Sequence, residues 1–166
     1  AERVSGEGGT YRLPEREIKD DHPQPSFTLA EAIQYSSNIA MAKFASRLPA
    51  PDQFGVLRDF GFGTPTGIEF PAESPGRLRL PRDWTSLSSA SLAMGYELSV
   101  TPLQLAAAYG GLANDGVLLR PTWIREIRGP DGVVRYRHRP EPVRRVVPQQ
   151  VAGALRELLI EIGCEE

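Results

Sequence analysis

Proline and glycine divide this chain into short elements. Its 166 residues include 15 prolines and 16 glycines, and both residue types interrupt regular helices and strands. Four prolines and four glycines fall within residues 61–82 alone. Because this segment also contains apolar residues that can anchor it to a core, we expect a long irregular loop within one domain, where such loops are often functional. The anchors are Phe62, Ile68, Phe70, Leu78 and Leu80.

Capping residues and prolines predict where the helices begin and end. Thr28 and Glu31 form a capping-box pair, in which each side chain can bond the other residue's backbone N–H. Pro49 and Pro51 should stop a helix that approaches them. The expected helices span residues 29–35, 39–47, 53–60 (capped by Asp52), 103–113 and a final stretch after Pro148.

The helix expected over residues 103–113 has clear signals at its start. Thr101 can cap it, and Pro102 at the first helical position loses no N–H that the helix would use. Few of its residues are charged, so we expect it to be buried on most sides, beneath a sheet. The final helix should have one apolar face, formed by Val151, Leu155, Leu158, Leu159 and Ile162.

Signals for strands are fewer. Residues 123–128 and 133–137 flank Gly129-Pro130-Asp131-Gly132, which predicts a β-hairpin. Short strands are also expected over residues 10–13 and 16–19, followed by a turn from Asp20 to Pro23.

Composition excludes several classes of function. A formal net charge of −2 gives no basic surface for nucleic acid or a membrane. No apolar run approaches the roughly 18 residues of a transmembrane helix. The single cysteine, Cys164, excludes an internal disulfide. His22 and His138 are far apart and lack neighbouring ligands, so we expect no metal site and no cofactor.

The triplet Ser36-Ser37-Asn38 lies between the first two expected helices, and two interpretations of it remain open at this point. In the first, Ser37 or Asn38 simply caps the following helix, since both residue types are preferred there. In the second, Ser36 and Asn38 face a cleft together while Ser37 points elsewhere, as residues i and i+2 do in an extended turn. A hydroxyl and an amide would then project from one short turn.

Several longer segments accompany the triplet in a fixed order. They are Tyr35-Ser36-Ser37-Asn38-Ile39-Ala40, Phe60-Gly61-Phe62-Gly63, Gly95-Tyr96, Ser99-Val100-Thr101-Pro102-Leu103-Gln104-Leu105 and Ala113-Asn114-Asp115-Gly116. With these segments, the chain resembles the transpeptidase domain of class B penicillin-binding proteins, which crosslink bacterial peptidoglycan. The segment around Thr101 is most similar to the division and sporulation branch of that family.

The resemblance implies an α+β fold of the penicillin-binding-protein transpeptidase (serine β-lactamase-like) type. Residues 1–166 would form an incomplete domain, a helical lobe plus a β-hairpin. The family acts through Ser-x-x-Lys, Ser-x-Asn and Lys-Thr-Gly motifs, of which only the second occurs here. We therefore expect the nucleophile motif before residue 1, the third motif after residue 166, and no activity from this chain alone.

The resemblance also implies roles for two residues of the triplet. Ser36 would be catalytic and pass a proton to the leaving group, and Asn38 would be catalytic and bind the substrate through its side-chain amide. The implied partners are peptidoglycan stem peptides, β-lactams, a membrane glycosyltransferase and division proteins. The implied location is extracytoplasmic, with an N-terminal anchor outside these residues.

Two alternatives come from other classes of protein. The chain could belong to a non-catalytic, penicillin-binding-like scaffold module, or to a serine β-lactamase or its sensor relative. The Thr101-Pro102-Leu103-Gln104 segment and the long proline- and glycine-rich loop argue against the β-lactamase alternative.

Overall fold

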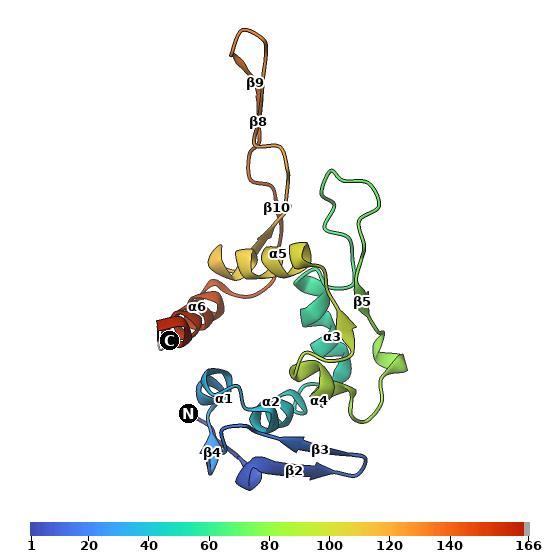
Figure 1. The fold of residues 1–166 in the computed structure, drawn as a ribbon, viewed down its shortest axis with the longest axis vertical. Helices are drawn as coiled ribbons and strands as arrows, with labels where there is room; N and C mark the ends of the chain where they lie inside the picture. The colour runs from blue at the N-terminus through green and yellow to red at the C-terminus, as the bar shows by residue number, and fades with distance from the viewer. Residues whose placement is uncertain (165–166) are drawn as a thin grey trace. The chain divides into compact units, whose positions relative to one another are not determined.

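Helices and short strands make up the computed structural model (Figure 1). It describes residues 1–164; Glu165, Glu166 and the side chain of Cys164 lie outside the described residues. Contacts divide the chain into two compact units. Unit 1 comprises residues 1–55, 78–98 and the chain from 157 onward, and unit 2 comprises residues 56–77 and 99–156.

Two antiparallel strand pairs lie in the first part of unit 1. β1 (Val4–Ser5) pairs with β4 (Ser26–Phe27), and β2 (Thr10–Leu13) pairs with β3 (Arg16–Lys19). The hairpin β2–β3 confirms the two short strands expected from the sequence. The pair β1–β4 was not predicted, because a two-residue strand has no alternating pattern to recognise.

Helix α2 (Asn38–Ala45) lies in the core of unit 1 and has no exposed residue. It contacts α1 (Leu29–Gln34), α4 (Ser88–Ala93), β1 and β3. Ile39 and Ala40 are fully buried and belong to two different apolar clusters. The buried members of these clusters are Val4, Phe27, Ala32 and Ala40 in one, and Ile18, Ile39 and Ala42 in the other. This packing fixes the N-terminal end of α2, where the Ser-x-Asn triplet lies.

Helix α3 (Ala50–Asp59) begins earlier than the sequence predicted. Asp52 was expected to cap it, but lies in its first turn, where its N–H donates to the carbonyl of Pro49 at 3.0 Å. Pro51 does not delay the helix, because the N–H that proline lacks has no acceptor in a first turn. The other long helices, α2, α5 (Pro102–Ala113) and α6 (Gln149–Cys164), begin at or next to the expected residues.

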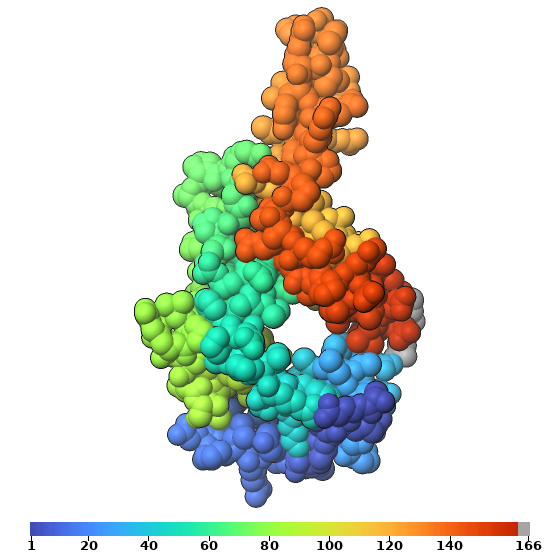
Figure 2. Space-filling view, turned by 180° about the vertical axis from the view of Figure 1, so that it is seen from behind, coloured from blue at the N-terminus to red at the C-terminus, as the bar shows by residue number. Residues whose placement is uncertain are grey.

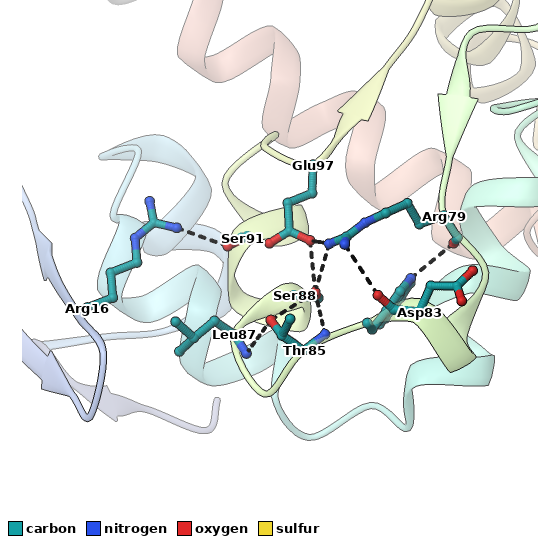
Figure 3. Close-up of polar contacts among 9 residues, drawn as sticks. Arg16, Arg79, Asp83, Thr85, Leu87, Ser88, Ser91 and Glu97 are labelled. Carbon is teal, nitrogen blue, oxygen red and sulfur yellow. Dashed lines mark hydrogen bonds and ion pairs between the residues drawn. The ribbon is translucent and has the colours of Figure 1, made fainter.

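A polar cluster holds the segment of unit 1 that runs from β5 (Arg77–Leu78) to β6 (Leu98–Ser99) (Figure 3). Arg79 forms an ion pair with Glu97, and both side chains are less than a third exposed, at 29% and 25%. Arg79 also donates to the Ser88 hydroxyl at 3.2 Å, and that hydroxyl donates to Glu97 at 2.8 Å. The cluster joins α4 to the two ends of this segment.

Replacing Arg79 by methionine should reduce the free energy of unfolding by about 2–3 kcal/mol, because Glu97 and Ser88 lose a charged partner in a half-buried site. Arg82→Met is the control, since Arg82 is 79% exposed and its ion pair with Asp83 spans 3.8 Å. The control should change stability by less than about 0.5 kcal/mol. Equal effects of the two substitutions in urea denaturation would contradict a stabilising role for the cluster.

In unit 2, one buried side chain organises the irregular segment expected from the sequence. Gln104 is 1% exposed, and its Nε2 donates to the carbonyls of Thr64 at 2.8 Å and Pro75 at 2.9 Å. Its Oε1 accepts the N–H of Thr101 at 2.9 Å, which completes the capping box of α5. The segment is therefore a loop held together by the side-chain amide of Gln104. Near its end it contains β5 and the 3₁₀ turn η2 (Pro81–Asp83).

Polar contacts hold this loop together with three of the five predicted apolar anchors. Ile68 is buried and Phe62 and Leu78 are half-buried. Phe70, however, is 63% exposed and Leu80 is 40% exposed. Glu73 accepts the N–H groups of Thr66 at 2.8 Å and Gly67 at 3.1 Å. Partial burial opposes ionisation of Glu73, yet these hydrogen bonds hold the pKa of its carboxyl below the ordinary value. The prediction that Phe70 and Leu80 anchor the loop was wrong.

Unit 2 also contains two antiparallel strand pairs. β8 (Glu126–Arg128) and β9 (Val134–Arg137) confirm the predicted hairpin, which projects from the rest of unit 2 (Figure 2). β7 (Val117–Leu119) and β10 (Pro142–Arg145) form a pair that was not predicted. The expectation of a helical lobe with a single hairpin therefore undercounted the strands, and every sheet among the described residues has two strands.

Helix α5 is less buried than its composition predicted. Gln104, Ala108 and Gly111 are its buried residues and lie on one face of the helix. Gly111 packs against Leu118 of β7, whereas the Gln104 side chain binds the loop. Leu105 is 44% exposed and Tyr109 is 55% exposed. A helix with few charges can therefore have one covered face only, because a single short strand pair is too narrow to cover more. None of the described helices has the length and apolar character needed to cross a membrane.

Candidate functional site

The turn between α1 and α2 places the Ser-x-Asn triplet at a helix-to-helix junction. α1 begins with the predicted capping box of Thr28 and Glu31. It ends at Gln34 with Tyr35 as its C-cap, and the N–H of Ser36 donates to the Ile33 carbonyl at 3.2 Å. The N–H of Ser37 donates to the Ala32 carbonyl at 2.9 Å. These two bonds define a Schellman motif, the arrangement that commonly closes a helix C-terminus.

Ser36 occupies the position of this motif where glycine is usual. Its φ is 52°, in the left-handed region, which costs an L-residue roughly 1–2 kcal/mol. Such strain persists only where the surrounding structure fixes the backbone, and it often marks functional positions. The extended turn expected from the sequence was therefore wrong: Ser36 is left-handed, Ser37 is extended and Asn38 begins the helix.

Ser37 is the N-cap of α2 and points inward. Its hydroxyl accepts the N–H of Ala40 at 3.0 Å and donates to Asp20 Oδ2 at 2.5 Å. Only 1% of Ser37 is exposed. The capping interpretation is thus confirmed for Ser37, and it does not compete with the functional interpretation because Ser36 lies on the opposite, exposed side of the turn.

Ser36 and Asn38 have different surroundings. Ser36 is exposed and lines a surface hollow of about 530 Å³ together with Asp21, His22, Gln34 and Tyr35. Asn38 is half-buried, and its Nδ2 donates to the carbonyl of Lys19 at 3.1 Å. An amide nitrogen has two hydrogens, so Asn38 can bind a second acceptor while it stays attached to β3. The roles of Ser36 and Asn38 in catalysis remain predictions.

Sequence reasoning missed Asp20 as part of this site. The residue was assigned only to a turn after β3, yet its carboxylate contacts the Ser-x-Asn turn at two points: it accepts from Ser37 and, at 3.0 Å, from the N–H of Ile39. The separation of 17 residues between Asp20 and Ser37 has no helical or strand period that could have indicated this contact. Among the described residues, no three His, Cys, Asp or Glu side chains are grouped to hold a metal ion.

The sequence of the chain matches a known protein family over nearly its whole length. The model of the penicillin-binding protein transpeptidase domain matches residues 2–163. The chain belongs to the penicillin-binding protein transpeptidase family. The resemblance noted from the sequence segments is thereby confirmed, and so is the α+β fold class.

Relatives with curated names agree with this assignment. The chain is 29% identical over 152 residues to the probable peptidoglycan D,D-transpeptidase PenA of Neisseria meningitidis, covering 92% of the chain and 24% of that relative. It is 36% identical to penicillin-binding protein PbpB of Mycolicibacterium smegmatis, covering 83% of the chain and 21% of the relative. The chain thus spans about a quarter of the length of these relatives.

Solved structures of the family share the fold. Penicillin-binding protein 3 of Mycobacterium tuberculosis, solved with ampicillin, superposes with a TM-score of 0.81 at 30% identity, over 95% of this chain and 34% of that one. The transpeptidase domain of Burkholderia pseudomallei penicillin-binding protein 3 gives a TM-score of 0.81 at 29% identity, over 95% and 45%.

Proposed function

We propose that this chain is the Ser-x-Asn part of a peptidoglycan D,D-transpeptidase, an enzyme that crosslinks stem peptides through a serine acyl-enzyme and binds penicillin. The observation that carries the proposal is the exposed, left-handed Ser36 at a doubly capped helix junction, in a chain that matches the transpeptidase family from residue 2 to 163. The names of the relatives, peptidoglycan D,D-transpeptidases among them, favour this function over a scaffold module or a β-lactamase.

The nucleophile of this reaction would be supplied by a Ser-x-x-Lys motif outside residues 1–166. No serine of this chain has a lysine three positions later, and neither Lys19 nor Lys43 begins a Lys-Thr-Gly motif. That outside serine would attack the carbonyl carbon of the penultimate D-alanine. The C–N bond to the terminal D-alanine then breaks, and an ester links the stem peptide to the enzyme.

Ser36 and Asn38 would assist this step. The departing amine needs a proton, which the Ser36 hydroxyl would pass on and regain from a motif lysine, since a serine hydroxyl alone is a poor acid. The Asn38 amide would donate to the carbonyl of the stem-peptide backbone. The amine of a second stem then attacks the ester, which forms the crosslink and releases the serine.

The whole protein would act outside the cytoplasm, held by an N-terminal anchor, with peptidoglycan stems as substrates and β-lactams as substrate mimics. A membrane glycosyltransferase and division proteins are its proposed partners.

A fluorescent penicillin tests the proposed function directly. The full-length protein should become covalently labelled, and an excess of unlabelled penicillin should prevent the labelling. Residues 1–166 alone should remain unlabelled under the same conditions, because the attacking serine lies elsewhere. A full-length protein that takes up no label would contradict the transpeptidase function, and labelling of residues 1–166 would contradict the position of the nucleophile.

A further inference from the structure

The end of strand β3 holds the Ser-x-Asn turn through three hydrogen bonds. The carbonyl of Lys19 accepts from the Asn38 side chain at 3.1 Å. The carboxylate of Asp20 accepts from the Ser37 hydroxyl at 2.5 Å and from the Ile39 N–H at 3.0 Å. Two consecutive residues of the strand end thus bind three consecutive residues of the turn.

Asp20 is itself fixed in place. It is 9% exposed, and its backbone N–H donates to the carbonyl of Gly9 at 3.2 Å. Ile39, whose N–H it binds, is fully buried. Both ends of these contacts are therefore rigid, and neither can move without disturbing the core of unit 1.

The hydrogen bond between Asp20 and Ser37 also determines which hydroxyl of the turn can react. Ser37 donates its only hydroxyl hydrogen to Asp20 and accepts from the Ala40 N–H, so its hydrogen-bonding capacity is largely used. Ser36 differs because it is exposed toward the hollow. Its left-handed backbone is strained and requires support from both sides of the turn. The Schellman bonds of α1 support one side, and Asp20 supports the other.

We infer that Asp20 is a positioning residue for the acyl-transfer site: its carboxylate locks Ser37 and the first turn of α2, and thereby fixes the Ser36 hydroxyl in its working geometry. The inference rests on the proposed function of Ser36. Asp20 does not touch the reacting atoms, so it acts on the rate through the position of Ser36. A displacement of about 1 Å at such a group can cost on the order of 100-fold in rate.

Asp20→Asn in the full-length protein tests this role with a fluorescent penicillin as the probe. The side-chain amide keeps one oxygen for the Ile39 N–H but presents N–H groups to Ser37, so the Ser37 hydroxyl can no longer donate there. The acylation rate constant should fall roughly 10- to 100-fold, while the dissociation constant of the initial non-covalent complex should change by less than about threefold. Asp52→Asn, at an exposed position of α3, makes the same change of charge and should acylate at the wild-type rate.

The double variant separates positioning from general stabilisation of the fold. If Asp20 acts through Ser36, adding Asp20→Asn to Ser36→Ala should slow acylation by less than about threefold further, because coupled residues are not additive. A further 10- to 100-fold loss in that background would overturn the inference, and so would a wild-type rate for Asp20→Asn alone. If Asp20→Asn does not fold, Ser37→Ala removes the same bond from the other side and should show the same non-additivity.

The outcomes also distinguish this inference from the proposed function. If Ser36→Ala itself leaves acylation unchanged, the proposed role of Ser36 fails, and the inference fails with it. If Ser36→Ala slows acylation while Asp20→Asn and Ser37→Ala do not, only the positioning role of Asp20 is overturned.

Discussion

Ser36→Ala should slow acylation of the full-length protein by a fluorescent penicillin by roughly 10²- to 10⁴-fold, the usual range for loss of a general acid or base. The fold should be almost unaffected, with a change below about 0.5 kcal/mol. Ser36 is exposed, and alanine meets the same strain in the left-handed region as serine does. A large kinetic effect without a stability effect would therefore locate the loss in the chemistry.

Two further variants make this result specific. Ser36→Gly also lacks the hydroxyl but relieves the backbone strain at φ 52°, so it should acylate slowly and yet be more stable by about 1 kcal/mol. Ser86→Ala removes an exposed hydroxyl elsewhere in unit 1 and should change neither property. Wild-type acylation by Ser36→Ala would reject the proton-transfer role of Ser36.

Gln104→Leu should reduce the free energy of unfolding by about 3–5 kcal/mol. Leucine has a similar size but no hydrogen-bonding groups, so the Thr64 and Pro75 carbonyls and the Thr101 N–H all lose their Gln104 partner. Each buried polar group left without a partner costs about 1–3 kcal/mol. Because these groups belong to the loop and to the cap of α5, the substitution should release the loop as well as weaken the helix.

Gln150→Leu provides the control for this prediction. Gln150 is exposed on α6, so the same change of side chain should shift stability by less than about 0.5 kcal/mol. The measurement is the free energy of unfolding from urea denaturation. The same m-value, the slope of that free energy against urea concentration, should fit all variants. If both glutamine variants have the same stability, Gln104 does not organise the loop.

Local signals predicted the parts of this fold that depend on neighbouring residues. The capping box of Thr28 with Glu31 and the cap of α5 by Thr101 are both present as predicted, because a cap joins residues only three positions apart. The β8–β9 hairpin was predictable for the same reason, since its turn residues lie between the two strands. Family resemblance supplied the fold class, which periodicity alone did not determine.

The contacts that shape the long loop and the Ser-x-Asn turn were not predictable because they are long-range or lack a residue signature. Gln104 serves as a local capping residue, but its other bonds reach carbonyls 29 and 40 residues away. Asp20 meets Ser37 across 17 residues. The left-handed conformation of Ser36 was hidden because glycine, the usual indicator of a Schellman motif, is replaced there by serine.

The position of the penicilloyl group tests most directly whether the nucleophile lies outside this chain. The full-length protein should be acylated with a penicillin and digested, and the modified peptide identified by mass spectrometry. We expect one adduct, on the serine of a Ser-x-x-Lys motif outside residues 1–166, while Ser36 stays unmodified. An adduct on Ser36, Ser37 or any other serine of this chain would contradict the supporting role assigned to the Ser-x-Asn turn.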